Sequence, residues 1–219
     1  MQVVPIRVNG LINQSVILSP SVATSHPVQH VYWNLQTHTI ASFTNSQLTV
    51  IRNEFKGRLE ILDDGRALRI GQLTLHDSGL YFVTITFMDN TNLDASYNLT
   101  VYEPVPTPSI KTEAIEKTSD WCNVTLRCSI PTNTSSLSYT WKYRHGDSDY
   151  QWYNNPGDTI QMSLQLESWD MEVLCIVHNP ADQKNSSPAK FCTNRMGQSR
   201  RTEKGKGQIT ILKYKSTIV

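Results

Sequence analysis

The three residue types of a catalytic triad stand side by side in this sequence, at His76, Asp77 and Ser78. A triad works only when the histidine lies between the nucleophile and the carboxylate, so that it can take the nucleophile's proton while the carboxylate orients its ring. Neighbours on one extended segment cannot take up that relay geometry. Because no other cluster of acidic residues and histidines stands out along the chain, the sequence predicts no catalytic residue and no enzymatic activity.

The four cysteines could also do chemistry, either as metal ligands or as disulfides. Structural zinc sites usually show Cys-x-x-Cys pairs or nearby histidines. No Cys-x-x-Cys pair occurs here, and the six histidines are scattered along the chain. The sequence therefore predicts disulfides, with no metal site and no cofactor.

Potential glycosylation sites accompany the cysteines. Asn-x-Ser/Thr sequons occur at five asparagines, and any one of them alone is weak evidence. Together with an even number of cysteines, they indicate passage through the secretory pathway, where disulfides persist and glycans are added. We therefore expect an extracellular protein that is glycosylated at Asn13, Asn98, Asn123, Asn133 and Asn185.

The elements that must position these residues are strands. Asp77, Gly79 and Tyr81 form an Asp-x-Gly-x-Tyr pattern that runs into alternating apolar residues. This pattern is typical of a tyrosine corner, where a strand enters an immunoglobulin-type sandwich and the phenol bonds back to the preceding backbone. Tyr81 and every second residue after it would then face inward. Arg58, at the start of an earlier strand, is expected near Asp77 as a structural ion pair.

The first half of the chain contains the other strands of a variable-type sandwich. Trp33, within a run of aromatic and apolar residues, fits the core tryptophan of such a fold. No cysteine occurs before Cys122, so this sandwich must hold its sheets together by apolar packing alone. Asp63, Asp64 and Gly65 mark a hairpin. Taken in order, the expected strands are residues 6–10, 14–18, 31–35, 39–43, 48–51, 55–61 and 67–70, the strand after the corner, and residues 94–102.

Length and proline content predict the domain organisation. With 219 residues the chain has room for two sandwiches of about a hundred residues each. Pro104, Pro106 and Pro108 favour a short extended linker, because proline cannot donate a ladder hydrogen bond. We expect an all-β protein with two tandem immunoglobulin-like β-sandwiches, variable-type over residues 1–102 and constant-type over residues 103–192. The proline-rich linker joins them, and a flexible basic tail follows at residues 193–219.

The second domain holds all four cysteines. Cys122 and Cys128 lie on one predicted strand, about 20 Å apart at roughly 3.3 Å per residue, which is beyond disulfide reach. Two pairings remain. We prefer Cys128 with Cys175 and Cys122 with Cys192, because Trp141 then completes the Cys…Trp…Cys core of an immunoglobulin sandwich. The crossed pairing is the alternative.

The charge balance argues against nucleic acid as a partner. Seven Lys/Arg and one Glu fall in residues 193–219, which leaves 13 basic and 18 acidic residues, a net charge of −5, in residues 1–192. Phosphate binding needs a basic stripe through the folded domain itself. The sequence contains no apolar run of ~18 residues, the length that a membrane span needs. Met1 is not followed by a charged and then apolar leader. We expect a secreted protein as written, or a cell-surface one if an anchor lies outside this sequence.

Several motifs together resemble the signalling lymphocytic activation molecule (SLAM) family of leukocyte receptors, over residues 6–192. They are Val8-Asn9-Gly10, a first domain without cysteine, Asp77-Ser78-Gly79-Leu80-Tyr81, Tyr102-Glu103-Pro104, Cys122-Asn123-Val124-Thr125-Leu126-Arg127-Cys128, Tyr139-Thr140-Trp141, Cys175-Ile176-Val177-His178-Asn179-Pro180 and Phe191-Cys192. Within the family, residues 55–58 and 104–111 look most like its short lipid-anchored lymphocyte ligand. Two positions depart from the family pattern: Val173 replaces a corner tyrosine, and Ala181-Asp182 follows Asn179-Pro180.

The resemblance implies an immune recognition module. Such a module would bind a SLAM-family receptor on lymphocytes or natural killer cells through the front sheet of its first domain. Homophilic and heterophilic binding both stay open, and so does a homodimer through the first domain. One alternative is a soluble decoy, from a splice form or a virus, that occupies the receptor. A glycan-binding sandwich is a weaker alternative.

The period of the strands places the expected contact residues. Because Trp33 and Tyr81 face inward, their neighbours on the same strands must face outward from the sheet. The loop after the corner strand would reach the partner's edge. A competing interpretation is that Tyr32 and Phe82 merely cover each other as a cross-strand pair. The expected partner-binding residues are Tyr32, Asn34, Thr39, Phe82, Thr84, Thr86, Met88, Asp89 and Asn90.

Overall fold

The computed structural model describes residues 4–21, 26–132, 137–154, 156–165 and 170–192. The expected glycosylation at Asn133 and the expected flexible tail at residues 193–219 lie outside the described residues. Within the described part the chain is built of strands, and its helices are three 3₁₀ helices of three residues each. None of these is long and apolar enough to cross a membrane. The prediction of an all-β protein is confirmed.

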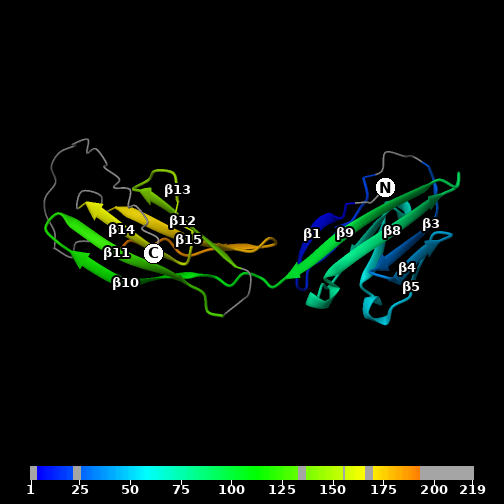
Figure 1. Ribbon diagram of the computed structural model, residues 1–219, viewed down its shortest axis with the longest axis horizontal. Coiled ribbons are helices and arrows are strands. Elements are labelled where there is room, and N and C mark those ends of the chain that lie inside the picture. The colour runs from blue at the N-terminus through cyan, green and yellow to red at the C-terminus, as the bar shows by residue number, and fades with distance from the viewer. Residues whose placement is uncertain (1–3, 22–25, 133–136, 155, 166–169, 193–219) are drawn as a thin grey trace, which may run out of the picture. The chain divides into compact units, whose positions relative to one another are not determined.

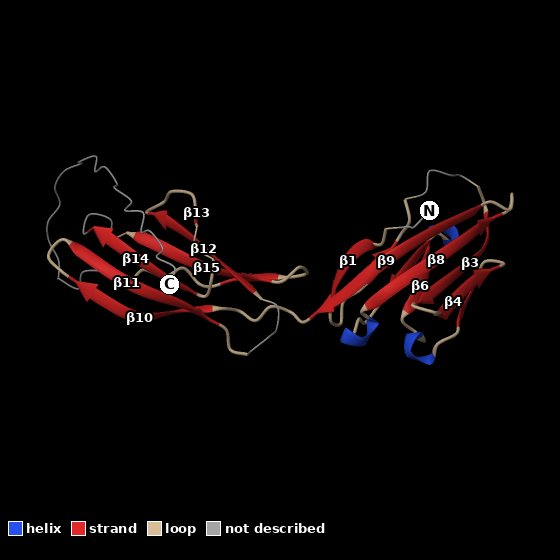
Figure 2. Ribbon diagram, in the orientation of Figure 1, coloured by secondary structure: helices blue, strands red, loops and turns tan. Residues whose placement is uncertain are grey.

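Two compact units divide the chain, with the main break between Thr107 and Pro108. The first unit is a sandwich of two sheets, with strand orders β1-β9-β8-β3-β4-β5 and β2-β7-β6 (Figures 1 and 2). Its strands are β1 (Ile6–Leu11), β2 (Val16–Leu18), β3 (Val28–Leu35), β4 (His38–Thr44), β5 (Gln47–Val50), β6 (Leu59–Leu62), β7 (Ala67–Ile70), β8 (Gly79–Phe87) and β9 (Asn92–Tyr102), and its 3₁₀ helices are η1 (Asn53–Phe55), η2 (Asp63–Gly65) and η3 (Leu75–Asp77).

Alternating apolar residues build the core of this first sandwich. On β8, the exposed fractions of Tyr81, Val83 and Ile85 are at most 1%. The residues between them face outward, as the two-residue period of a strand requires. Trp33 is completely buried, and its ring centroid lies 6.2 Å from that of Tyr97. Each fully buried large apolar side chain contributes about 1.5–3 kcal/mol. The sheets are therefore joined by apolar packing, without a disulfide.

A tyrosine corner leads into β8. The Tyr81 hydroxyl donates a 2.8 Å hydrogen bond to the Asp77 carbonyl, and burial raises the pKa of this hydroxyl. The Asp77 carboxylate is itself buried and accepts hydrogen bonds from the Thr74 backbone N–H at 2.7 Å and the Thr74 hydroxyl at 3.1 Å. It also pairs with Arg58. The corner and the ion pair lie where the sequence predicted them.

Several strand boundaries differ from the prediction by one to four residues, those of β6 and β9 among them. Strand β6 begins at Leu59 instead of residue 55, because the chain first forms η1, which buries Phe55, and then turns at Gly57 with a φ of +75°. Strand β9 begins at Asn92, two residues earlier than expected, because Asn92 still pairs with Thr86 on β8. Neither boundary shift changes which residues of these strands face the core.

The first strand joins the larger sheet. β1 pairs in parallel with β9, from Ile6 opposite Tyr97 to Leu11 opposite Tyr102. β2 instead pairs with β7 in the smaller sheet. The larger sheet consequently has six strands, and its outward side is the broader of the two surfaces of this sandwich.

The strands after Pro108 form a second two-sheet sandwich, with strand orders β10-β11-β14 and β13-β12-β15-β16. Disulfides join Cys128 to Cys175 and Cys122 to Cys192, which is the pairing preferred from the sequence. Trp141 is fully buried, and its indole N–H donates to the Gly157 carbonyl at 2.9 Å. The strands are β10 (Ser109–Lys117), β11 (Trp121–Ser129), β12 (Ser138–His145), β13 (Gln151–Tyr153), β14 (Thr159–Gln165), β15 (Met171–His178) and β16 (Gln183–Asn185).

Candidate functional site

The outward side of the six-stranded sheet, called the front face below, carries most of the expected contact residues. Strands β3 and β8 lie at its centre (Figure 1). Trp33 and Val83 point into the core, so their neighbours Tyr32 and Thr84 point outward. Because the sheet register fixes which residues lie opposite one another, the front face can be described as rows that cross the strands.

Three rows of side chains make up the centre of the front face. The middle row runs from Asp94 on β9 through Thr84, Tyr32 and Ser42 to Thr49 on β5. The row nearer the β8–β9 turn contains Asn92, Thr86, His30, Thr44 and Gln47. The row nearer the tyrosine corner contains Ser96, Phe82, Asn34 and Thr39.

Tyr32 and Phe82 lie in different rows. Tyr32 is opposite Thr84, whereas Phe82 is opposite Asn34, so the two aromatic residues are diagonal neighbours and not a direct cross-strand pair. Tyr32 is 45% exposed and Phe82 is 38% exposed. Among the described residues, the ring that contacts Tyr32 is that of His30, edge-on at a centroid distance of 5.5 Å. The register therefore excludes direct opposition of the two rings, and the interpretation that they cover each other as a cross-strand pair stays a prediction.

Polar side chains on the front face are held by hydrogen bonds across strands. The Thr39 hydroxyl donates to the Asn34 side-chain oxygen at 2.7 Å. The Thr84 hydroxyl donates to the Asp94 carboxylate, also at 2.7 Å. A register shift between Trp33 and Asn34 aligns Asn34 with Thr39. These bonds fix side chains that would otherwise rotate freely at the surface.

Formal charge is nearly absent from the strands of the front face. Arg7 on β1 and Asp94 on β9 are the charged residues of all six strands. They lie on the two strands at one side of the sheet, β1 and β9. The other outward side chains include aromatic, hydroxyl and amide groups, His30 and the aliphatic Leu80.

The turn between β8 and β9 continues the front face at one end. Met88 is 61% exposed. The Asp89 carboxylate accepts hydrogen bonds from the Thr91 hydroxyl at 2.6 Å and the Thr91 backbone N–H at 3.0 Å, and lies 2.7 Å from Nδ1 of His26. These hydrogen bonds from Thr91, with a smaller contribution from His26, lower the pKa of Asp89. Asn90 takes a left-handed backbone conformation, with a φ of 62°.

The structure thus brings the expected contact residues together on one surface, and it adds others. His30, Ser42, Thr49 and Asp94 lie in the same rows but were not predicted. His30 was missed because the strand was expected to begin at residue 31, although its spacing from Tyr32 is the same period of two. Ser42 and Thr49 follow from strand pairing, which no local pattern gives.

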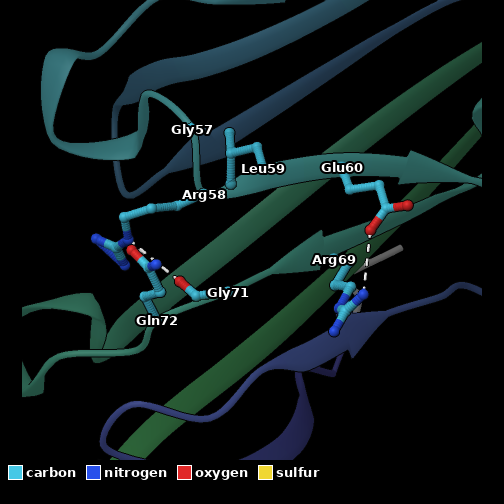
Figure 3. Close-up of a pocket in the computed structure, with 7 residues that line it drawn as sticks. All are labelled: Gly57, Arg58, Leu59, Glu60, Arg69, Gly71 and Gln72. Atoms are coloured by element: carbon cyan, nitrogen blue, oxygen red, sulfur yellow. Dashed lines mark hydrogen bonds and ion pairs between the residues drawn. The ribbon is translucent and has the colours of Figure 1, made fainter.

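A hollow in the first unit lies beside β6 and β7 and is lined by Arg58, Glu60, Arg69 and neighbouring residues (Figure 3). Its charged side chains are already paired: Arg58 donates to the Gly71 carbonyl at 3.2 Å, and Arg69 pairs with Glu60 at 3.2 Å. Within the described ranges, no group of three or more potential ligand side chains is arranged to hold a metal ion.

The described sequon asparagines are all exposed: Asn13, Asn98, Asn123 and Asn185. The Asn123 side-chain oxygen accepts a hydrogen bond from Ser163 at 2.7 Å. Asn98 lies on the front face, opposite Leu80 of β8. Glycosylation of these residues stays a prediction.

Comparison with known proteins identifies the first domain and the relatives of the chain. Residues 3–102 match the family model of the immunoglobulin V-set domain. The human T-lymphocyte surface antigen Ly-9 is 26% identical over 214 residues, which cover 95% of this chain and 32% of Ly-9. Mouse SLAM family member 5 is 26% identical over 183 residues, which cover 82% of this chain and 49% of that protein. The chain therefore spans less than half the length of either relative.

A solved structure with a similar fold is the CD2-binding domain of CD58, also called lymphocyte function-associated antigen 3. It superimposes with a TM-score of 0.60 at 20% sequence identity, over 87% of this chain and 100% of the CD58 chain. At this level of identity the similarity concerns the fold alone. It supports the immunoglobulin-like fold described above.

Proposed function

We propose that this chain, a relative of the SLAM family whose first domain is an immunoglobulin V-set domain, is an extracellular immune recognition module. Its front face would bind a SLAM-family receptor on lymphocytes or natural killer cells. The relatives support the recognition module as a class. The composition of the front face supports the position of the binding site.

The observation that carries this proposal is the exposed Tyr32 at the centre of a nearly uncharged sheet. Interface cores are depleted in charged residues and enriched in aromatic ones, and Tyr is among the residues most often found as hot spots. Arg7 and Asp94 are both confined to β1 and β9. A partner could therefore cover β3 and β4 without burying an unpaired charge.

The front face is also ordered before a partner arrives. Hydrogen bonds hold Asn34 to Thr39 and Thr84 to Asp94, and the His30 ring contacts Tyr32. Ordering a rotamer-rich side chain on binding costs about 0.5–1.5 kcal/mol. Side chains that are already held lower this cost.

The test is binding of the purified chain to immobilised ectodomains of Ly-9 and SLAM family member 5, and to itself. Tyr32→Asp should lower the affinity for any ectodomain that binds by at least about tenfold, or ~1.4 kcal/mol, because it places a charge in the centre of the interface. Ile17→Asp is the matched control, since Ile17 is 54% exposed on the smaller sheet. If a folded Tyr32→Asp variant bound normally, or both variants lost binding equally, the front face would not be the site.

A further inference from the structure

One predicted glycosylation site lies on the proposed binding surface. Asn98 is exposed between the buried residues Tyr97 and Leu99 on β9, so its side chain shares the outward side of the sheet with Phe82 and Tyr32. Its direct neighbours across the strands are Leu80 on β8 and Arg7 on β1. Any glycan on Asn98 would therefore stand on the front face.

The Asn98 side chain is available for modification. It lies in the sequence Asn98-Leu99-Thr100, and a threonine completes its sequon. Across the described residues, no hydrogen bond engages its amide. The Asn123 side chain, by contrast, already accepts a bond from Ser163.

Asn98 is much closer to Phe82 than to Tyr32. Phe82 is one strand across and two residues along, a distance of about 8 Å from the strand rise and spacing. Tyr32 is two strands across and four residues along, roughly 16 Å away by the same geometry. A glycan on Asn98 would therefore begin close to Phe82 and far from Tyr32.

We propose that an N-glycan on Asn98 covers the front face around Leu80 and Phe82 and confines the partner to the other part, called the open region below. The open region contains His30, Tyr32, Ser42, Thr84, Thr86 and the turn residues Met88, Asp89 and Asn90. This inference rests on the proposed function. A glycan is bulky and strongly hydrated, so an interface that buried the surface at its root would have to displace it.

This division assigns different roles to the two aromatic side chains. Tyr32 anchors the partner, because it lies in the open region and is already held by His30. Phe82 is an apolar side chain that the glycan shields, which limits the apolar surface left exposed on the unbound protein. The exposed fractions of Tyr32 and Phe82, 45% and 38%, are similar and do not distinguish these two roles.

The experiment moves the glycan across the face. The full chain is secreted from mammalian cells, and glycopeptide mass spectrometry measures occupancy at Asn98. Thr84→Asn creates a sequon completed by Thr86 in the open region, and Ile17→Asn creates one completed by Ser19 on the opposite sheet. Thr84→Gln controls for loss of the threonine without a glycan, and thermal melting confirms folding of each variant.

Binding to immobilised Ly-9 and SLAM family member 5 ectodomains, and to the chain itself, is the readout. Asn98 should be occupied, and Asn98→Gln should change the affinity by less than about twofold, because the partner does not reach that part of the face. The glycan of Thr84→Asn should weaken binding by more than about tenfold relative to Thr84→Gln. The glycan of Ile17→Asn should leave binding unchanged.

Three results would overturn the inference: an unmodified Asn98, a change of more than about tenfold for Asn98→Gln, or full binding by glycosylated Thr84→Asn. Binding that appeared only after Asn98→Gln would keep the front face as the site while removing the glycan boundary. If the chain bound none of the three probes, with or without its glycans, the proposed function would fail and the inference with it. The two failures are therefore distinguishable.

Discussion

The Tyr81 hydroxyl donates a hydrogen bond of 2.8 Å to the backbone carbonyl of Asp77. The carboxylate of the same aspartate pairs with Arg58 and accepts two hydrogen bonds from Thr74. One residue thus ties the entry of β8 to the rest of the sandwich through its backbone and its side chain. Because the side chains of β8 alternate from this point, the corner also determines that Phe82 and Thr84 face outward.

Tyr81→Phe should destabilise the first domain by about 1–1.5 kcal/mol, because it removes one buried hydrogen bond and leaves the Asp77 carbonyl without its donor. Thermal melting measures this loss as a lower midpoint for one transition. Tyr32→Phe is the matched control, since the Tyr32 hydroxyl is exposed and makes no hydrogen bond to a described residue. Equal midpoints for Tyr81→Phe and the unaltered chain would show that the corner bond contributes nothing to stability.

Asp77→Ala should cost more, about 3–5 kcal/mol, because it leaves the Arg58 guanidinium largely buried without its partner charge. Glu60→Ala breaks the surface pair with Arg69 and should cost no more than about 1 kcal/mol. Denaturant unfolding of both variants gives the comparison. Similar losses for the two variants would contradict the view that burial makes the Arg58–Asp77 pair important.

The two domains should respond differently to reduction. The first has no cysteine, whereas the disulfide between Cys128 and Cys175 closes a loop of 47 residues in the second. A loop of this length corresponds to a loss of about 4 kcal/mol when the bond is opened. Calorimetry of the whole chain should show two unfolding transitions. Reductant should lower the temperature of one transition and leave the temperature of the other unchanged. A fall in both transitions would mean that the first domain depends on the second.

The sequence predicted the features that depend on local patterns. Asp77, Gly79 and Tyr81 gave the corner, and the alternation after Tyr81 gave the inward and outward sides of β8. The predicted start of β6 at residue 55 was wrong, because the apolar Phe55 fits a strand as well as it fits the 3₁₀ helix in which the structure buries it. Local spacing cannot distinguish these two environments for a single apolar residue.

The rows of the front face depend on contacts between distant segments, so they could be predicted from the sequence only in part. Tyr32 was correctly placed outward, but its neighbour Ser42 lies on β4 and is aligned by the sheet register. The shift between Trp33 and Asn34 changes that register by one residue and brings Thr39 opposite Asn34. No pattern within β3 alone predicts such a shift.

The stability of the turn after β8 should depend on pH through the ionisation of Asp89. Its lowered pKa means that the ionised carboxylate is favoured in the folded turn. The stabilisation is present above the pKa of the unfolded chain and is lost as the pH falls through the lower folded value. Thr91→Val removes the hydroxyl donor and should raise the pKa of Asp89, as measured by carboxyl carbon NMR titration. An unchanged titration would assign the shift to the backbone N–H of Thr91 or to His26 instead.

His30 should influence binding through Tyr32. Its ring lies edge-on to the Tyr32 ring at 5.5 Å, and this contact limits the orientations of the exposed phenol. His30→Ala would free the Tyr32 side chain, so that ordering it on binding would cost about 0.5–1.5 kcal/mol, or roughly two- to tenfold in affinity. His38→Ala is the control, because His38 is exposed at the start of β4 and does not contact Tyr32. Titration against the ectodomain that binds the unaltered chain measures both variants. If His30→Ala bound normally while Tyr32→Asp did not, Tyr32 would be ordered by the partner and not by its neighbour.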